Sequence, residues 1–307
     1  MWRFGERWNW HDYLSRPVTA GGMVFIANNS GSLFALDALT GEICWEALTG
    51  EEVPKRGKEA LGADVTPFGL VCAVGSMILV GDSSGCLRVY SGESGTLLRE
   101  RQFTDSMLAV EHLGGEIWVS SLEGVVAVAS VDTLTPRWQH CVRNQLRSPV
   151  IPMGDLALAL LMSGELVALG RTDGGIAWTI GSIAAVARQW LGGRNILAST
   201  MCGELVRIDL ATGETRPFFG RQIGRIFGDL VVDSNLVYVE TLEGILQINM
   251  SERTVCRVYR GVDDRQSVSF AVDGEELYVF EENGGHIIAI RGGQRRWRKR
   301  VGFYDLT

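Results

Sequence analysis

Few residues of this chain have the types and the spacing that catalysis requires. Its 307 residues include only four histidines, His11, His112, His140 and His286. No HxxxH, HExxH or spaced Cys/His set occurs, so no zinc site is expected. The sequence also lacks a GxSxG elbow, a Walker loop and a dinucleotide-binding fingerprint. These absences predict that the protein holds neither a metal nor a cofactor.

One acid–base pair remains, Glu111 and His112, on an expected strand. Adjacent residues of a strand point to opposite faces, so at most one of them can face a shared cavity. If the protein is an enzyme, these two are its candidate catalytic residues, and changing either should abolish turnover while ligand binding persists. Sister repeats place Trp190 and Thr19 where His112 stands, so inward packing of His112 is the alternative interpretation.

Arginines form a second candidate group. Guanidinium groups bind carboxylates and phosphates through paired hydrogen bonds. We predict that Arg16, Arg147, Arg188 and Arg225, together with Trp190, line one funnel that binds an anionic small molecule or an acidic protein segment. The turns expected on the same face carry carboxylates, namely Asp82, Glu123, Glu243, Glu281 and Glu282. Ion pairs between these groups and the arginines, joining neighbouring repeats, are the alternative.

A sequence motif repeated seven times predicts the strands that carry these residues. It is fullest as Gly31-Ser-Leu-Phe-Ala-Leu-Asp-Ala-Leu-Thr-Gly-Glu-Ile-Cys-Trp45. After a first interval of 54 residues, the copies follow at intervals of 39 to 41 residues, anchored at Gly85, Gly124, Gly164, Gly203, Gly244 and Gly285. A period near forty with several short strands per copy is typical of propeller blades. We therefore predict an all-β protein, a seven-bladed β-propeller of four-stranded antiparallel blades, with residues 15–307 as one domain.

The repeats also predict where the strands lie. The innermost strands are expected near residues 17–21, 68–74, 107–113, 148–152, 184–191, 226–232 and 267–272. No helix longer than three turns is expected in the body. The cationic run Gln294–Arg300 is expected to be a charged edge strand, with a phosphate-binding patch as the alternative.

The first repeat contains the string Ala35-x-Asp37-x-x-Thr40-Gly41-Glu42-x-x-Trp45. Asp37 can accept hydrogen bonds from backbone N–H groups two and three residues ahead, and Gly41 can adopt the positive φ that closes the turn. A tryptophan after this turn can pack against the neighbouring blade. Its place is taken by Trp138, Trp178 and Trp297 in three other repeats, and by Arg99, Pro217 and Arg257 in the remaining three.

This string resembles the tryptophan-docking motif of the PQQ-like repeat β-propellers, which include quinoprotein dehydrogenases and BamB-like outer-membrane assembly lipoproteins. The resemblance implies eight blades and export for both groups, and for many quinoproteins a disulfide between adjacent cysteines and a calcium site. This chain shows seven repeats, no adjacent cysteines and no export signal. PQQ binding, alcohol oxidation and outer-membrane assembly are therefore not expected.

Composition limits the partners. The net charge of −7 argues against binding to nucleic acid, and no apolar run is long enough to cross a membrane. The N-terminus lacks the apolar region of a signal peptide, and the six cysteines are dispersed, which predicts reduced thiols in a cytoplasmic protein. We expect a monomer or a weak oligomer.

Two segments depart from the repeat. Residues 1–14 are rich in aromatic side chains and are expected to seal the ring or to cap its channel. Residues 47–64 lengthen the first interval and are expected to lie beside the channel mouth.

Two classes of function remain. The first is a non-catalytic ligand- or protein-binding propeller that uses the arginine-rimmed face. The second is a small-molecule enzyme of the cyclase, lyase or hydrolase type with its site at the same channel mouth. The absence of a catalytic constellation favours the first.

Overall fold

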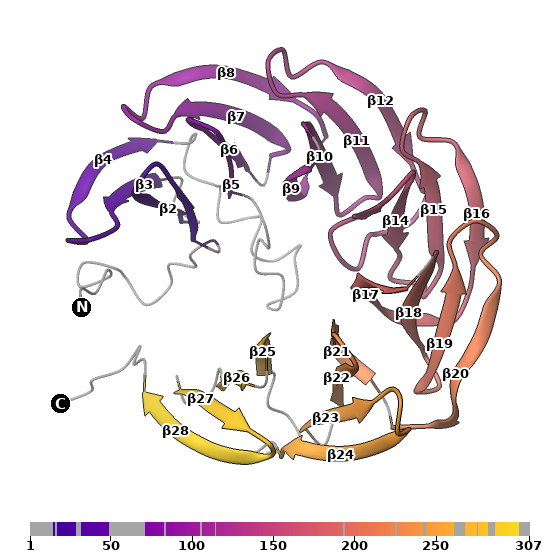
Figure 1. Cartoon of the computed structure of the whole chain (residues 1–307). Helices are drawn as coiled ribbons and strands as arrows, with labels where there is room; N and C mark the ends of the chain where they lie inside the picture. Colours follow the sequence, from indigo (N-terminus) through magenta and orange to yellow (C-terminus); the bar gives the residue numbers. More distant parts are fainter. Residues whose placement is uncertain are drawn as a thin grey trace. The chain divides into compact units, whose positions relative to one another are not determined.

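The computed structural model describes residues 15, 17–28, 32–48, 71–82, 84–104, 106–113, 115–192, 194–224, 226–241, 244–260, 268–274, 276–281 and 286–300. All regular elements in these ranges are strands, which form seven four-stranded sheets (Figure 1). In every sheet the strands lie in chain order, and neighbouring strands pair antiparallel. No described helix is long and apolar enough to cross a membrane.

The sheets are numbered 1 to 7 along the chain. Sheets 1 to 3 contain β1 (Val18–Ala20), β2 (Met23–Ala27), β3 (Ser32–Asp37) and β4 (Ile43–Leu48); β5 (Val71–Val74), β6 (Met77–Gly81), β7 (Cys86–Ser91) and β8 (Leu97–Gln102); and β9 (Met107–Leu113), β10 (Glu116–Ser121), β11 (Val125–Ser130) and β12 (Pro136–Cys141). Sheet 4 contains β13 (Ile151–Met153), β14 (Leu156–Leu160), β15 (Leu166–Gly170) and β16 (Ile176–Ile180).

Sheets 5 to 7 contain β17 (Ile183–Gly192), β18 (Asn195–Thr200), β19 (Glu204–Asp209) and β20 (Thr215–Gln222); β21 (Ile226–Asp233), β22 (Leu236–Thr241), β23 (Gly244–Asn249) and β24 (Thr254–Tyr259); and β25 (Val268–Asp273), β26 (Glu276–Glu281), β27 (His286–Arg291) and β28 (Gln294–Arg300). The chain divides into two compact units, Met1–Ser163 with Val167–Ala177, and Gly164–Leu166 with Trp178–Thr307. Each unit is described by itself.

The first strand of each sheet lies close to its predicted range. In sheet 2, residues 68–70 of the predicted range lie outside the described residues. In sheet 4 both ends differ, because β13 spans Ile151–Met153 and the prediction spanned 148–152. Pairing with the second strand starts earlier, because Leu146 bridges Leu161 and the N–H of Arg147 donates to the Leu160 carbonyl over 2.8 Å. It is interrupted around Pro149, which has no N–H to donate.

Apolar residues of adjacent sheets form the core. The second and third strands are largely buried, as in β6 and β7 of sheet 2, and one apolar cluster joins Leu79 and Leu87 of that sheet to Ile117 and Val119 of sheet 3. Strands buried on both faces lose the alternation of apolar and polar residues that a half-exposed strand shows. This explains near-continuous apolar segments such as Leu156–Leu160.

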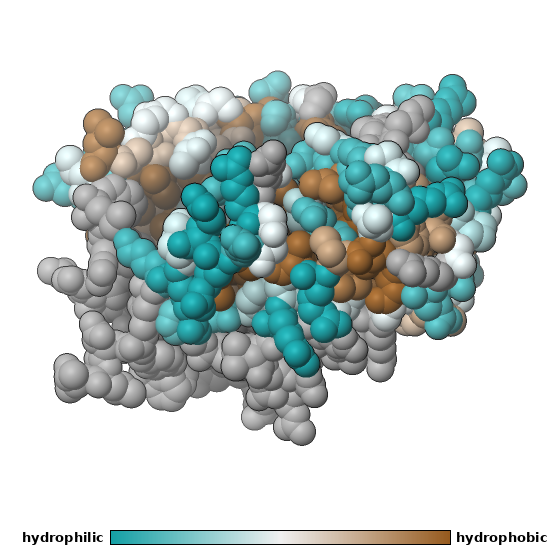
Figure 2. Space-filling view, turned by 60° about the horizontal axis from the view of Figure 1, so that its bottom comes forward, coloured by the Kyte–Doolittle hydropathy of each residue, from teal (hydrophilic) through white to brown (hydrophobic). Residues whose placement is uncertain are grey.

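The fourth strands are the most exposed. Every residue of β8 is exposed, and so are residues 294–299 of β28. Figure 2 brings forward the side of β24 and β28, where hydrophilic side chains gather around smaller apolar areas. The cationic run is therefore confirmed as an exposed strand at the edge of its sheet.

The turn chemistry predicted for the first repeat is confirmed. Asp37 Oδ1 accepts hydrogen bonds from the N–H groups of Leu39 (2.9 Å) and Thr40 (2.7 Å), and Gly41 has a φ of 75°. These bonds stabilise the ionised carboxylate, with those from the Thr40 and Leu39 N–H groups contributing most, and lower the pKa of Asp37. Asp209 makes the same bonds in sheet 5.

Three tryptophans pack on the next sheet, as predicted. The indole N–H groups of Trp45, Trp138 and Trp178 donate to the carbonyls of Gly92, Arg171 and Leu210 over 2.9 to 3.0 Å. Each ring also covers a glycine of the next turn, and a Cβ added to Gly95, Gly174 or Gly213 would lie 2.5 to 2.8 Å from a ring atom. Glycine is required there because any side chain would collide with the indole.

In sheets 3 and 6, the turn between the third and fourth strands lacks this glycine. Arg99 and Pro217 replace the tryptophan in the preceding sheets, 2 and 5. The glycine position of the next turn then holds Leu134 (φ 55°) and Arg253 (φ 55°), which keep the left-handed backbone conformation. The backbone conformation thus persists without the tryptophan, while the steric demand for glycine disappears.

All six cysteines are free in the structure. Cys86 is buried and Cys72 half-buried, and the other four are exposed. Burial raises the pKa of both Cys72 and Cys86, which lowers their reactive thiolate fraction.

Thiol titration checks this arrangement. Under denaturing, non-reducing conditions we expect six free thiols. In the native protein, Cys44, Cys141, Cys202 and Cys256 should react before the other two, because they are exposed. Four or fewer thiols after denaturation would contradict the prediction of a reducing compartment.

Candidate functional site

In each sheet, one end carries the turn between the second and third strands and the connections to neighbouring sheets. We call it the connection end. Among the described arginines of the prediction, Arg147 lies in such a connection, whereas Arg188 lies within the strand β17. Arg16 and Arg225 lie outside the described residues, and so does the side chain of Trp190, whose backbone pairs with Ile196. Arg147 is half-buried before β13, and Arg188 is exposed on β17 in the other unit. Their convergence in one funnel stays a prediction.

The connection from sheet 3 to sheet 4 carries Arg143 and Arg147. Arg143 has a φ of 60°, a left-handed conformation uncommon for residues with a side chain. The backbone of Arg147 is held by its hydrogen bond to Leu160. Neither guanidinium forms an ion pair or a side-chain hydrogen bond with the described part of the chain.

Two carboxylates of the connection end bind arginines of their own sheets. Asp82 Oδ2 pairs with Arg88, whose Nε also lies 3.2 Å from Glu100 Oε2. Glu281 pairs with Arg298 at 2.7 Å. Asp82 and Glu281 are therefore paired with arginines of their own sheets and not with Arg143 or Arg147. Glu243 and Glu282 lie outside the described residues.

Glu281 is the centre of a buried polar cluster between sheets 6 and 7. The residue is only 2% exposed, and its carboxylate accepts hydrogen bonds from the Tyr259 hydroxyl (2.6 Å) and Arg298 Nη2 (2.7 Å). His286 Nδ1 lies 4.0 Å from the same carboxylate. Burial and the bond to Glu281 raise the pKa of Tyr259, so its hydroxyl remains a donor.

Sequence reasoning named Glu281 but missed Tyr259 and Arg298. A usable signal was present, since other sheets place a small hydroxyl or carboxylate at this turn, for example Ser121 and Asp82, where it accepts a backbone N–H four residues ahead. The longer side chain of Glu281 at this position indicates a hydrogen-bond donor outside the turn.

The candidate acid–base pair lies on β9. Glu111 pairs in register with Trp118, and His112 with Ile117, and both are half-buried. The thiol of Cys72 lies nearby, but burial raises its pKa, the charge of Glu111 adds to this, and a hydrogen bond with the His112 backbone only partly opposes it. A thiol held protonated is a poor nucleophile.

Metal binding finds no support in the ranges given above. Among those residues, no group of three or more His, Cys, Asp or Glu side chains is placed to hold an ion.

Comparison with known proteins identifies a matching family and two curated relatives. The family model described as outer membrane protein assembly factor BamB matches residues 5–102 and 47–257. The protein of that name from Shewanella oneidensis is 25% identical over 185 residues, which cover 54% of this chain and 43% of that protein. Its namesake from Nitrosomonas eutropha is 24% identical over 287 residues, 87% of this chain and 55% of the relative. The chain thus spans about half the length of these curated relatives.

Solved structures agree on the fold. BamB from Moraxella catarrhalis superposes with a TM-score of 0.70 at 16% identity, covering 94% of this chain and 88% of that one. The designed protein Ika8 gives 0.71 at 12% identity, covering 93% and 86%. Sqt1 from Saccharomyces cerevisiae also gives 0.71 at 12% identity, covering 94% and 84%.

Similarity at these identities shows the fold alone, and proteins with different names share it. It confirms the predicted all-β architecture, seven four-stranded antiparallel sheets that match the BamB propeller. The family model covers more than half of the sequence and includes the repeats that carry Trp45, Trp138 and Trp178. The chain therefore belongs to the PQQ-like repeat family of β-propellers that the BamB model describes.

Proposed function

We propose that this protein is a non-catalytic, protein-binding β-propeller whose connection end docks an acidic segment of a partner. The observation that carries the proposal is the family match, whose model and two curated relatives are all named for protein assembly. The sequence-based argument against an assembly role rested on blade number and an export signal, and the family match weakens it.

The charge of the partner segment is inferred from the connection from sheet 3 to sheet 4. Arg143 and Arg147 make no ion pair among the described residues, in a protein whose net charge is −7. Cations left without carboxylates in an acidic protein favour a negatively charged partner, since oppositely charged surfaces guide association. Arg16, Arg188 and Arg225 complete the proposed surface.

Site-specific cross-linking tests the docking surface. A photo-reactive amino acid at position 147 should capture one reproducible partner protein in cells that make this chain. The matched control is position 194, an exposed arginine in the turn between β17 and β18, at the opposite end of its sheet. Equal capture at both positions, or none at 147, would contradict the proposal.

The contribution of charge to the interaction is then tested with the captured partner. Replacing Arg147 and Arg225 together by alanine should weaken binding about tenfold or more and reduce its salt dependence, because charge-assisted hydrogen bonds are lost. The melting temperature should hardly change. Arg194→Ala should bind normally. A large loss of stability would show that the two arginines stabilise the fold. Unchanged binding would show that the partner segment is not recognised through its charge.

A further inference from the structure

Sheet 5 differs from its sisters where the tryptophan should pack. In sheets 1, 3 and 7 the third strand offers a small apolar residue, Ala35, Val128 or Ala289, directly opposite the tryptophan. In sheet 5 the corresponding pair is Arg207 on β19 and Arg216 on β20. The register there lacks the bulge that the other three sheets show beside this pair, and Pro217 follows Arg216.

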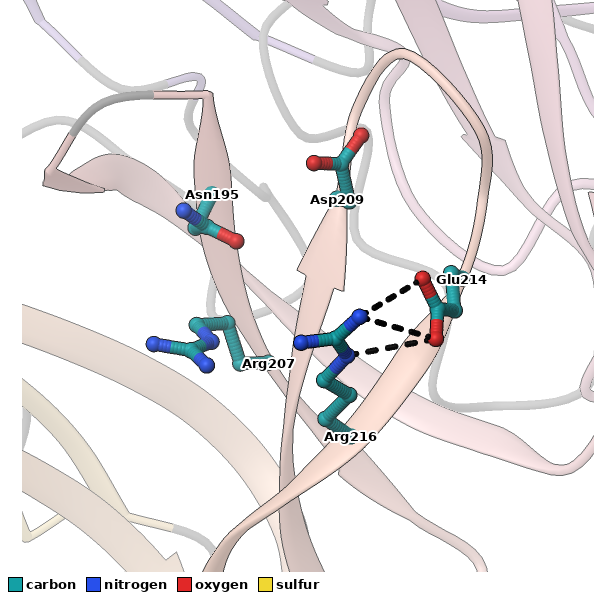
Figure 3. A pocket seen from close by; sticks show the side chains of 5 residues that line it. All are labelled: Asn195, Arg207, Asp209, Glu214 and Arg216. Atoms are coloured by element: carbon teal, nitrogen blue, oxygen red, sulfur yellow. Dashed lines mark hydrogen bonds and ion pairs between the residues drawn. The ribbon is translucent and has the colours of Figure 1, made fainter.

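A pocket occupies this place. It has a volume of about 240 Å³ and is lined by Asn195, Arg207, Asp209, Glu214 and Arg216 (Figure 3). The residues come from the beginning of β18, the end of β19 and the beginning of β20, which lie at the end of sheet 5 opposite its connection end. Within sheet 5 the pocket therefore lies at the end opposite the turn between β18 and β19.

The formal charges of the two arginines and two carboxylates in the pocket sum to zero, but they are not paired evenly. Arg216 is held by Glu214 through three contacts of 3.1 to 3.2 Å. Asp209 Oδ1 already accepts the N–H groups of Ala211 and Thr212. Arg207 is exposed and has no hydrogen bond or ion pair in the described ranges, and Figure 3 shows it extending away from Arg216, below Asn195.

Arg207 and Arg216 also oppose each other across the strand pair. Like charges at directly opposite positions destabilise an antiparallel pair. Glu214 pairs with Arg216 and the charge of Asp209 also acts on Arg216, whereas Arg207 has no ion pair among the described residues. An anion beside Arg207 would reduce the repulsion between the two arginines and would gain the two parallel N–H donors of a guanidinium.

We propose that this pocket binds a carboxylate or phosphate group, with Arg207 as the principal donor and the Asn195 amide beside it. Arg216 and Glu214 act as a fixed pair that positions the wall of the pocket. The side chains are exposed, so binding of a small anion alone is expected in the millimolar range.

Arginine side-chain NMR tests the site directly, by following the Nε–Hε signals of arginine-labelled protein. Sodium phosphate should shift the signals of Arg207 and of its pocket neighbour Arg216 saturably, while sodium chloride at equal ionic strength should shift neither. N-acetylglutamate amide, compared with N-acetylglutamine amide, provides the carboxylate arm. A response to phosphate alone, or to glutamate alone, identifies the source of the oxyanion.

Two variants make the result decisive. Arg207→Ala restores the small residue of the sister sheets, so it should raise the melting temperature in chloride by about 1–2 °C and abolish the saturable shift at Arg216. The control Arg194→Ala should leave the shift at Arg207 intact. The proposal is overturned if neither probe produces a saturable shift, if chloride or the glutamine derivative produces the same one, or if the shift at Arg216 persists in Arg207→Ala. None of these outcomes bears on cross-linking at position 147.

Discussion

Replacing Trp138 by alanine is expected to lower the free energy of unfolding by about 3–5 kcal/mol, the range found for large aromatic side chains in cores. The ring is 8% exposed, meets Trp118 edge to face at 5.8 Å and donates its N–H to the Arg171 carbonyl. Its removal leaves a cavity between sheets 3 and 4, and the Arg171 carbonyl keeps only its hydrogen bond from Arg137. Chemical denaturation of the variant and the parent measures the loss.

The companion change is Gly174→Ala. The added Cβ would lie 2.5 Å from the Trp138 ring, and the backbone at Gly174 has a φ of +71°. Collision and backbone strain should together cost about 2–4 kcal/mol. In the Trp138→Ala background only the strain remains, so the cost of Gly174→Ala should fall by half or more. Additive losses would show that the two residues do not interact.

Trp297 is the matched control within the same motif. It stands at the same place in sheet 7, but it is 45% exposed and its described ring contact is Tyr278 at 6.2 Å. Trp297→Ala should therefore cost clearly less than Trp138→Ala, because less apolar area is buried. Equal losses of unfolding free energy in the two variants would show that burial of the ring does not decide the cost.

Replacing Arg298 by alanine is the second change with a large expected effect, a loss of about 2–3 kcal/mol in unfolding free energy. Breaking a fully buried ion pair costs about 3–5 kcal/mol, and the exposed part of Arg298 lowers that figure through solvent screening. The loss arises because Glu281 stays buried with one of its two donors gone. Arg296→Ala, two residues away on the same strand and without a described partner, should change stability little.

The same cluster predicts a dependence on alkaline pH. The pKa of Tyr259 is raised in the folded protein above its ordinary value of 10.0. A raised pKa stabilises the fold below the unfolded value, and this contribution is lost as the pH rises toward the folded value. Stability should therefore fall above about pH 10, and less steeply in Tyr259→Phe. Identical alkaline profiles would show that Tyr259 does not titrate with unfolding.

Local chemistry made most of the fold predictable. The seven strand groups, the Asp37 turn and the exposed cationic strand β28 follow from repeat spacing, from short-range hydrogen bonds and from alternation along a strand. Each of these depends on residues a few positions apart, so one copy of the repeat contains the information. Arg147 was likewise placed correctly in a connection, because connections lie between the strands that the repeat defines.

The tertiary structure decided what crosses from sheet to sheet or depends on pairing register. Trp138 requires Gly174, 36 positions later, and Glu281 takes its donor from Tyr259, 22 positions earlier. The pocket at Arg207 lies where the register places two arginines opposite each other, while the repeat alone showed only that Pro217 stood in the place of a tryptophan. Burial, register and the distance between such groups arise from packing of whole sheets, and no local pattern of residue types contains them.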